Sequence, residues 1–330
     1  MKNVKKGIVV IYDKVEDRSG IDIYSDNLEF SSPVLVNALE NAVETLSDFV
    51  TYYSSPSDFI DNIALHKDDI VLSTIWSGVN SRNRKILIPA ICESYNIQYV
   101  GADAFVQSLG ADKSLSKMYC KAFGMNVPNE VQLHKGLNHD MSLSMSKYPA
   151  VIKPNYEGSS IGISDNNIVY DSNQSKKLID SLMLKYESIL MEEYIEGMEV
   201  SACIVGHNDN IKLFEISKLI LDGKDYFTDQ LWGLESKKGG RVKQEREIIT
   251  DKINEEMKNL FLTIFKSLGK VDFMRIDGRI RDGKFMLIEL TPDCTLHPDC
   301  FMYFSFQHNG YSYADMISIL IQNTLEYYNM

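Results

Sequence analysis

The chain has 330 residues, of which 44% are hydrophobic and 24% are charged, and its formal net charge is −12. These values are typical of a folded globular protein, and the length predicts two or three compact units. The negative charge argues against a nucleic-acid-binding protein, since such binding depends on clustered Lys and Arg. A small-molecule enzyme fits better, although the charge also serves solubility alone.

The apolar stretches fall well short of the roughly 20 residues that a membrane helix needs. The apolar segment near the N-terminus is also too short for a secretory signal. Five cysteines are scattered without Cys-x-x-Cys spacing, which favours reduced thiols over a zinc site. We therefore expect a cytoplasmic protein with neither a membrane nor a nucleic-acid partner; a homodimer is compatible with the sequence.

The first hundred residues follow the pattern of a parallel α/β layer. Short β-branched runs at 7–12, 69–75 and 97–100 alternate with longer helical patterns. Ser32 and Pro33 are suited to the start of a helix whose apolar residues recur at helical spacing. These features predict a Rossmann-like layer.

Two further regions follow it. The second is expected to be a small α+β unit, with helices at 114–123 and 175–184 and a strand at 150–153. The third is expected to have strands at 199–205, 211–216, 271–280 and 284–290, and helices at about 251–268 and 312–328. The sequence thus predicts an α/β (α+β) fold with domains at 1–110, 111–190 and 191–330.

Between Leu219 and Arg246 the chain loses regular periodicity. A loop this long is typically a lid or a binding loop, with a disordered insertion as the alternative. Lys238 lies within it and is a candidate for contacting phosphate or substrate.

A strand that ends at Lys153 and Pro154 leads into a glycine-rich and serine-rich loop. The loop contains Glu157, Gly158, Ser159, Ser160 and Gly162. Such loops expose backbone N–H groups that can hold phosphates, although Gly-Ser turns are also common elsewhere.

Two acidic side chains are expected to meet across a hairpin. The strand at 271–280 places Arg275, Asp277 and Arg279 on one face, and Asp282-Gly283 closes the turn. The returning strand is expected to place Met286, Ile288 and Leu290 on one face and Glu289 and Thr291 on the other. Adjacent carboxylates need compensation. Magnesium together with nucleotide phosphates would compensate the two negative charges. The alternative is an ordinary ion-pair network in which Arg275 and Arg279 pair with the acids.

These motifs resemble the ATP-grasp enzymes, and among them the D-alanine:D-alanine ligase branch, over most of the chain from Gly101 onward. The matching segments are Tyr99-Val100-Gly101, Gly110-Ala111-Asp112-Lys113 with Lys117, the strand with Lys153, Met191 through Glu199, Arg275-Ile276-Asp277 and Glu289-Leu290-Thr291. The resemblance implies an ATP-grasp fold with an N-terminal Rossmann-like domain, a small central domain and a C-terminal mixed-sheet domain. It also implies an ADP-forming carboxylate–amine ligase that makes an amide bond through an acyl phosphate.

The resemblance further implies a role for each matching residue. The ATP-binding set would be Lys113, Lys153, Glu157, Gly158, Ser159, Ser160, Glu192, Tyr194, Ile195 and Glu199. Within it, Glu192 would accept the adenine amino group and Glu199 would bind the ribose. The catalytic set would be Arg275, Ser159 and Lys238. Asp277, Glu289 and Thr291 would hold one or two Mg²⁺ ions, which Mn²⁺ can replace.

The sequence departs from the family pattern around the substrates. Thr291 replaces an Asn, and 292–298 lacks the family's Pro-Gly turn and carboxylate-binding serine, for which Thr295 or His297 can substitute. Arg82 and Arg84 can bind a carboxylate, or else are ordinary solvated arginines. We expect a substrate pair other than two D-alanines, with amino acids among the carboxylates and amines.

A second interpretation is an ATP-binding regulatory or scaffold protein of the same fold that has lost turnover. The sequence argues against a Rossmann dehydrogenase, because the first strand is not followed by the dinucleotide-binding motif Gly-x-Gly-x-x-Gly.

Overall fold

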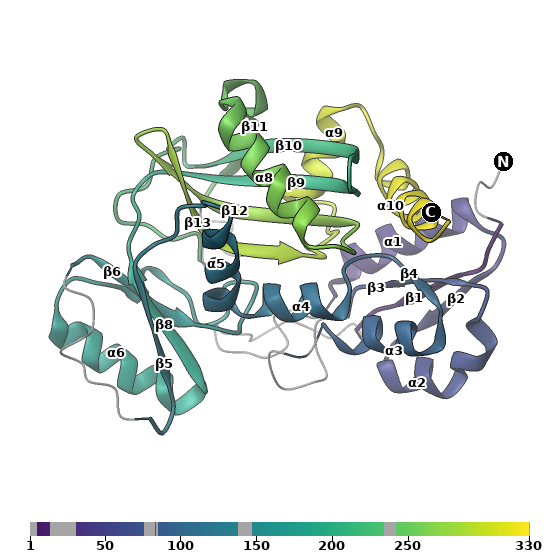
Figure 1. Ribbon diagram of the computed structural model, residues 1–330, viewed down its shortest axis with the longest axis horizontal. Coiled ribbons are helices and arrows are strands. Elements are labelled where there is room, and N and C mark those ends of the chain that lie inside the picture. The colour runs from purple at the N-terminus through teal and green to yellow at the C-terminus, as the bar shows by residue number, and fades with distance from the viewer. Residues whose placement is uncertain are drawn as a thin grey trace.

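The computed structural model describes residues 5–13, 31–75, 83, 85–137, 147–233 and 242–329. The strands among these residues form three sheets (Figure 1). The N-terminal sheet and the central sheet lie at opposite ends of the view, and the third sheet lies between them. None of the described helices is long and apolar enough to cross a membrane.

The N-terminal sheet is parallel throughout, with the strand order β2-β1-β3-β4. Its elements are β1 (Ile8–Ile11), α1 (Pro33–Leu46), β2 (Val50–Tyr53), α2 (Pro56–Asn62), β3 (Ile70–Ser73), α3 (Leu87–Tyr95) and β4 (Gln98–Tyr99). Ile8 and Val10 pack toward α1, whereas Val9 and Ile11 pack toward α2 and α3. Ser32 caps α1 by accepting a 3.2 Å hydrogen bond from the backbone three residues on. The parallel layer and its first helix are confirmed.

The central sheet is antiparallel, with the order β5-β8-β6-β7. Its elements are β5 (Glu130–His134), β6 (Ala150–Pro154), β7 (Ile168–Val169), α6 (Ser172–Lys185) and β8 (Ser188–Glu193). Ile179 and Leu182 of α6 pack on Ala150 and Ile152 of β6. Because β8 continues to Glu193, the sheet extends past the expected boundary at residue 190.

The third sheet has the order β11-β10-β9-β12-β13 and is covered by helices on both faces (Figure 1). Its strands are β9 (Met198–His207), β10 (Asn210–Leu221), β11 (Gln244–Ile248), β12 (Phe273–Arg281) and β13 (Lys284–Pro292). One face packs against α4 (Ala104–Ala111), α5 (Lys113–Ala122) and α8 (Glu255–Ser267). The other packs against α9 (Phe301–His308) and α10 (Tyr313–Tyr328), and α10 also packs against α1.

The hairpin between β12 and β13 forms with one irregularity. Asp277 lies opposite Glu289 as predicted, but Gly278 lies opposite Leu287, so Ile288 is an extra residue. The expectation that Met286, Ile288 and Leu290 share one face is therefore wrong. Phe285, Leu287 and Leu290 are buried in the core, and Ile288 lines a cavity instead. A β-bulge of this kind shifts the facing of every residue on one side of it.

The irregular segment is shorter than the sequence indicated. Strand β10 continues to Leu221 and β11 begins at Gln244, so Leu219 and Arg246 are paired strand residues. The expectation of an irregular segment from Leu219 to Arg246 is therefore wrong at both ends. Part of the remaining loop, including Lys238, lies outside the described residues.

Candidate active site

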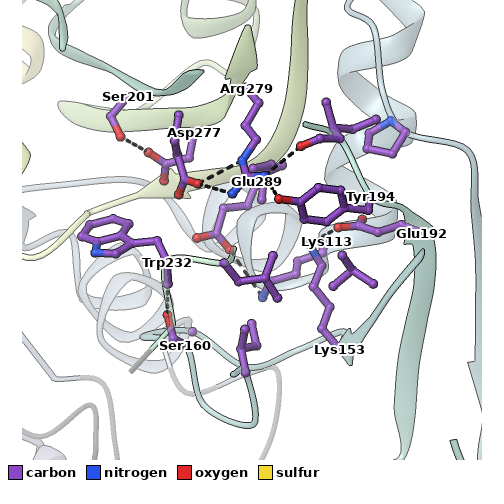
Figure 2. Close-up of a pocket in the computed structure, with 18 of the residues that line it drawn as sticks. Lys113, Lys153, Ser160, Glu192, Tyr194, Ser201, Trp232, Asp277, Arg279 and Glu289 are labelled. Carbon is purple, nitrogen blue, oxygen red and sulfur yellow. Dashed lines mark hydrogen bonds and ion pairs between the residues drawn. The ribbon is translucent and has the colours of Figure 1, made fainter. Parts of the chain in front are cut away.

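A cavity of about 120 Å³ is walled by the central and third sheets and the start of α5 (Figure 2). Twelve of the residues that the sequence singled out line it: Lys113, Lys153, Glu157, Gly158, Ser160, Glu192, Tyr194, Ile195, Glu199, Arg275, Asp277 and Glu289. They come from strands β6, β8, β9, β12 and β13, from the loop after β6, from the connection after β8 and from the first residue of α5. Motifs separated by up to 176 residues of sequence, from Lys113 to Glu289, therefore form one site.

Lys113 and Lys153 are held beside each other by Asn155, a residue that sequence reasoning missed. The Asn155 side-chain oxygen accepts a 3.1 Å hydrogen bond from the Ser114 backbone, and its amide donates to Asp112 at 2.9 Å. Asn155 is completely buried. It thus joins the end of β6 to the start of α5. Its position just after Lys153 and Pro154, where a strand ends, was the only available signal.

Glu192 lies between two buried lysines. Its two carboxylate oxygens pair with Lys117 and Lys153, and Lys117 also contacts Glu130 at 2.8 Å. Burial alone would raise the pKa of Glu192, but the two ammonium groups outweigh burial and lower this pKa to about 2. Burial lowers the pKa of Lys153 despite the attraction of Glu192. Lys117 was noted in the sequence only as part of a motif, and it proves to be a central charge of this network.

The loop after β6 bends sharply beside Lys113. The Lys113 ammonium donates to the backbone oxygen of Glu157. Ser159 and Ser160 have positive φ angles of 48° and 64°, and the Ser160 hydroxyl donates to the Trp232 backbone oxygen at 3.1 Å. Ser159 is exposed and is absent from the cavity wall. Its catalytic role remains a prediction.

The acidic pair is compensated by cations in this structure. Arg275 Nε donates to Asp277 Oδ1 at 2.6 Å, and Lys113 lies 3.5 Å from Glu289 Oε2. Burial would lower the pKa of Arg275, but the Asp277 carboxylate raises it overall. Ser201 and Thr291 hydroxyls also donate to Asp277, at 2.6 and 3.1 Å. The sequence left open an ordinary ion-pair network as the alternative to magnesium, and the Arg275–Asp277 pair of that network is present.

Arg279 does not join that network, because it pairs with Glu199 at 2.9 Å. It also donates to the backbone oxygen of Ile195 at 2.8 Å and to the Tyr194 hydroxyl at 2.9 Å. Tyr194, Ile195 and Glu199, three of the expected ATP-binding residues, are thus organised around one guanidinium that the sequence did not assign to them.

No cluster of three metal-ligating side chains of the His, Cys, Asp or Glu type occurs within the described ranges. The Asp277 and Glu289 pair nevertheless matches Mg²⁺, which usually takes one or two carboxylates together with phosphate oxygens. The residues present therefore fit a magnesium ion that is shared with a nucleotide. They do not form an independent cage.

Thr295 and His297, two of the expected substrate-binding residues, are not part of the cavity wall. Thr295 Oγ1 accepts from the His297 backbone N–H at 3.2 Å, and His297 Nδ1 accepts from the Asp299 backbone N–H at 3.0 Å. Both side chains thus take part in a local turn. Arg82 and Arg84, like Lys238, lie outside the described residues.

Comparisons with known proteins agree with this geometry. The family model "D-ala D-ala ligase C-terminus" matches residues 119–322. A D-alanine–D-alanine ligase of Aquifex aeolicus is 26% identical over 238 residues, which cover 71% of this chain and 76% of that protein. The structure of a Bacillus anthracis D-alanine–D-alanine ligase complexed with ATP superposes with a TM-score of 0.72 at 18% identity, covering 97% of this chain and 98% of that one.

The VanG D-Ala:D-Ser ligase of Enterococcus faecalis shares the fold with a TM-score of 0.68 at 18% identity, covering 97% of this chain and 99% of that one. These likenesses confirm the predicted ATP-grasp fold. Since the family model spans well over half of the residues, the chain belongs to the D-alanine–D-alanine ligase family of ATP-grasp ligases.

Proposed function

We propose that this ATP-dependent ligase joins a small carboxylate to an amine through an acyl phosphate and releases ADP. The observation that carries the proposal is the meeting of Lys113, Lys153, Arg275, Asp277 and Glu289 at one cavity. Two ammonium groups, a guanidinium and two carboxylates suit phosphoryl transfer, which depends on positioning and electrostatics and needs no side-chain nucleophile.

In the first step, a carboxylate oxygen of one substrate attacks the γ-phosphorus, the bond to the bridging oxygen breaks and ADP leaves. In the second step, the amine attacks the acyl carbon, and inorganic phosphate leaves as the amide forms. Lys113 and Lys153 bind phosphate oxygens during transfer. Arg275 stabilises the negative charge that develops at the reacting centre.

Asp277 and Glu289 would hold Mg²⁺, or Mn²⁺ in its place. The ion supplies neutralisation of phosphate charge when bound. Thr291 orients Asp277 through its 3.1 Å hydrogen bond, and its service as a ligand of a second ion is part of the proposal. Arg275, which already touches Asp277, fixes the direction of this carboxylate.

The substrate pair is proposed to differ from two D-alanines. Asp293, within the segment that departs from the family pattern, is half-buried and accepts a 2.8 Å hydrogen bond from the Ala102 backbone. This hydrogen bond fixes the segment to the backbone at Ala102, in a region where the sequence lacks the family's Pro-Gly turn and serine. A protein of the same fold is a D-Ala:D-Ser ligase, so the fold accommodates an amine other than D-alanine. Arg82, Arg84, Thr295 and His297 are the proposed substrate contacts.

A coupled assay of ADP release, run over a panel of amino acids and small carboxylic acids in pairs, tests the proposal. We expect ADP release that requires one carboxylate, one amine and Mg²⁺ together. Efficient formation of D-alanyl-D-alanine would contradict a different substrate pair. ATP binding without ADP release in every pair would favour the regulatory or scaffold protein instead.

A further inference from the structure

Arg279 lies in the cavity wall with 2% of its surface exposed, and all five of its N–H groups are used. Nε and Nη2 donate to Glu199 Oε2 at 3.1 and 2.9 Å. Nη1 donates to the Tyr194 hydroxyl at 2.9 Å and to the Ile195 backbone oxygen at 2.8 Å. Nη2 also donates to the Gln230 backbone oxygen at 2.7 Å.

A buried guanidinium is tolerated only when its charge and its donors are compensated. Here a carboxylate and three neutral oxygens compensate the guanidinium of Arg279. Its central carbon, Cζ, lies 5.2 Å from the centre of the Tyr194 ring and 5.5 Å from the centre of the Phe227 ring. One side chain therefore ties together three segments: the connection after β8, the start of β9 and the loop that carries Gln230. A guanidinium fork suits this task, because lysine has no planar array of five donors.

The contacts also leave the two oxygens of Glu199 unequal. Both bonds from Arg279 end on Oε2, and no donor to Oε1 is found among the residues that the structure describes. Since Glu199 lines the cavity, Oε1 is available to a hydroxyl group of a bound ligand. Arg279 thus orients the Glu199 carboxylate.

We propose that Arg279 is a positioning residue that sets selectivity for the ribose of the nucleotide, by holding Glu199 through Oε2 so that Oε1 meets a ribose hydroxyl. The inference rests on the proposed function, in which a nucleotide occupies this cavity. Without Arg279, the Glu199 side chain loses its fixed direction, and the energetic difference between ribose and deoxyribose is lost.

The test compares dissociation constants for ATP, 2′-deoxy-ATP and 3′-deoxy-ATP by calorimetry with Mg²⁺ present. We expect the unaltered enzyme to favour ATP about tenfold over at least one deoxy analogue, the order expected for one hydrogen bond to a charged group. Arg279→Met and Arg279→Lys should bring that ratio close to one. Arg281→Met is the matched control, because Arg281 lies on the same strand, is partly exposed and is 3.8 Å from Glu193; it should retain the ratio.

An Arg279→Met enzyme that keeps the full preference for ATP would overturn the inference. So would an equal loss of affinity for all three nucleotides, because that result is expected of a merely structural residue. If the methionine variant does not fold, the lysine variant decides by the same ratio. Absence of ATP binding by the unaltered enzyme would instead refute the proposed function.

Discussion

Replacing Glu192 with Gln removes one negative charge from between two buried ammonium groups while keeping the size of the side chain. The pKa of Glu192 is about 2, against an ordinary 4.5. At about 1.4 kcal/mol per pKa unit, this difference corresponds to about 3 kcal/mol of stability at neutral pH. Because the folded-state pKa is the lower one, the contribution is complete above pH 4.5 and is lost as the pH falls toward 2.

Urea unfolding of both proteins at pH 7 and pH 3 measures this contribution. We expect Glu192→Gln to be about 3 kcal/mol less stable at pH 7, and the gap to narrow by about 2 kcal/mol at pH 3. Glu193→Gln is the control on the next residue of β8, where the carboxylate is partly exposed and 3.8 Å from Arg281. The unfolding free energy of this control variant should stay within about 0.5 kcal/mol of that of the unaltered protein at both pH values. A gap at pH 7 below about 1 kcal/mol, or one that does not narrow in acid, would refute the reasoning.

Three further predictions follow from the site and its loop. Lys113→Met should weaken ATP binding at least about tenfold in calorimetry, because a charge-assisted phosphate contact is lost; unchanged affinity would contradict that contact. Asp277→Asn should lower ADP release at least about 100-fold and raise the Mg²⁺ concentration needed for half-maximal rate, and an unchanged Mg²⁺ requirement would count against the acidic pair as the metal site. Gly162→Ala should cost about 2 kcal/mol in urea unfolding, since φ is 71° and a Cβ would lie 2.8 Å from the Tyr186 hydroxyl. Gly136→Ala, at φ 80° with nothing within 4 Å, should cost about 1 kcal/mol, and equal losses would show that the contact with Tyr186 is unimportant.

Local signals in the sequence predicted the elements whose causes are local. The helix after Ser32 has its cap and its proline adjacent to it, and the turn at Asp282-Gly283 adopts the positive φ angles, 51° and 71°, that this residue pair favours. That turn sets the register of the two strands as far as Gly278 and Leu287, because a two-residue turn fixes the pairing of the strands near it. Beyond that point, Asp277 lies opposite Glu289 only because of the bulge at Ile288.

Features that depend on distant partners could not be predicted in the same way. The bulge at Ile288 arises from how β13 pairs with β12, and nothing in the alternation of side chains marks it. Strand β10 continues to Leu221 because β11 returns to pair with it 23 residues later. Lys117 meets Glu192 across 75 residues of sequence, and only the tertiary fold brings the two charges together.

The ion pairs in the cavity differ in strength in a way that bears on how a nucleotide would enter. Lys153 is 4% exposed and its partner Glu192 is also buried, so this pair is held in a region of low dielectric. Lys113 lies 3.5 Å from Glu289, whose side chain is 30% exposed, so solvent weakens their attraction. A phosphate therefore competes for Lys113 at a smaller energetic cost than for Lys153. On the proposed function, exchange at Lys113 also ends its ion pair with Glu289, a proposed metal ligand, so that phosphate binding and metal binding assist each other at this one pair.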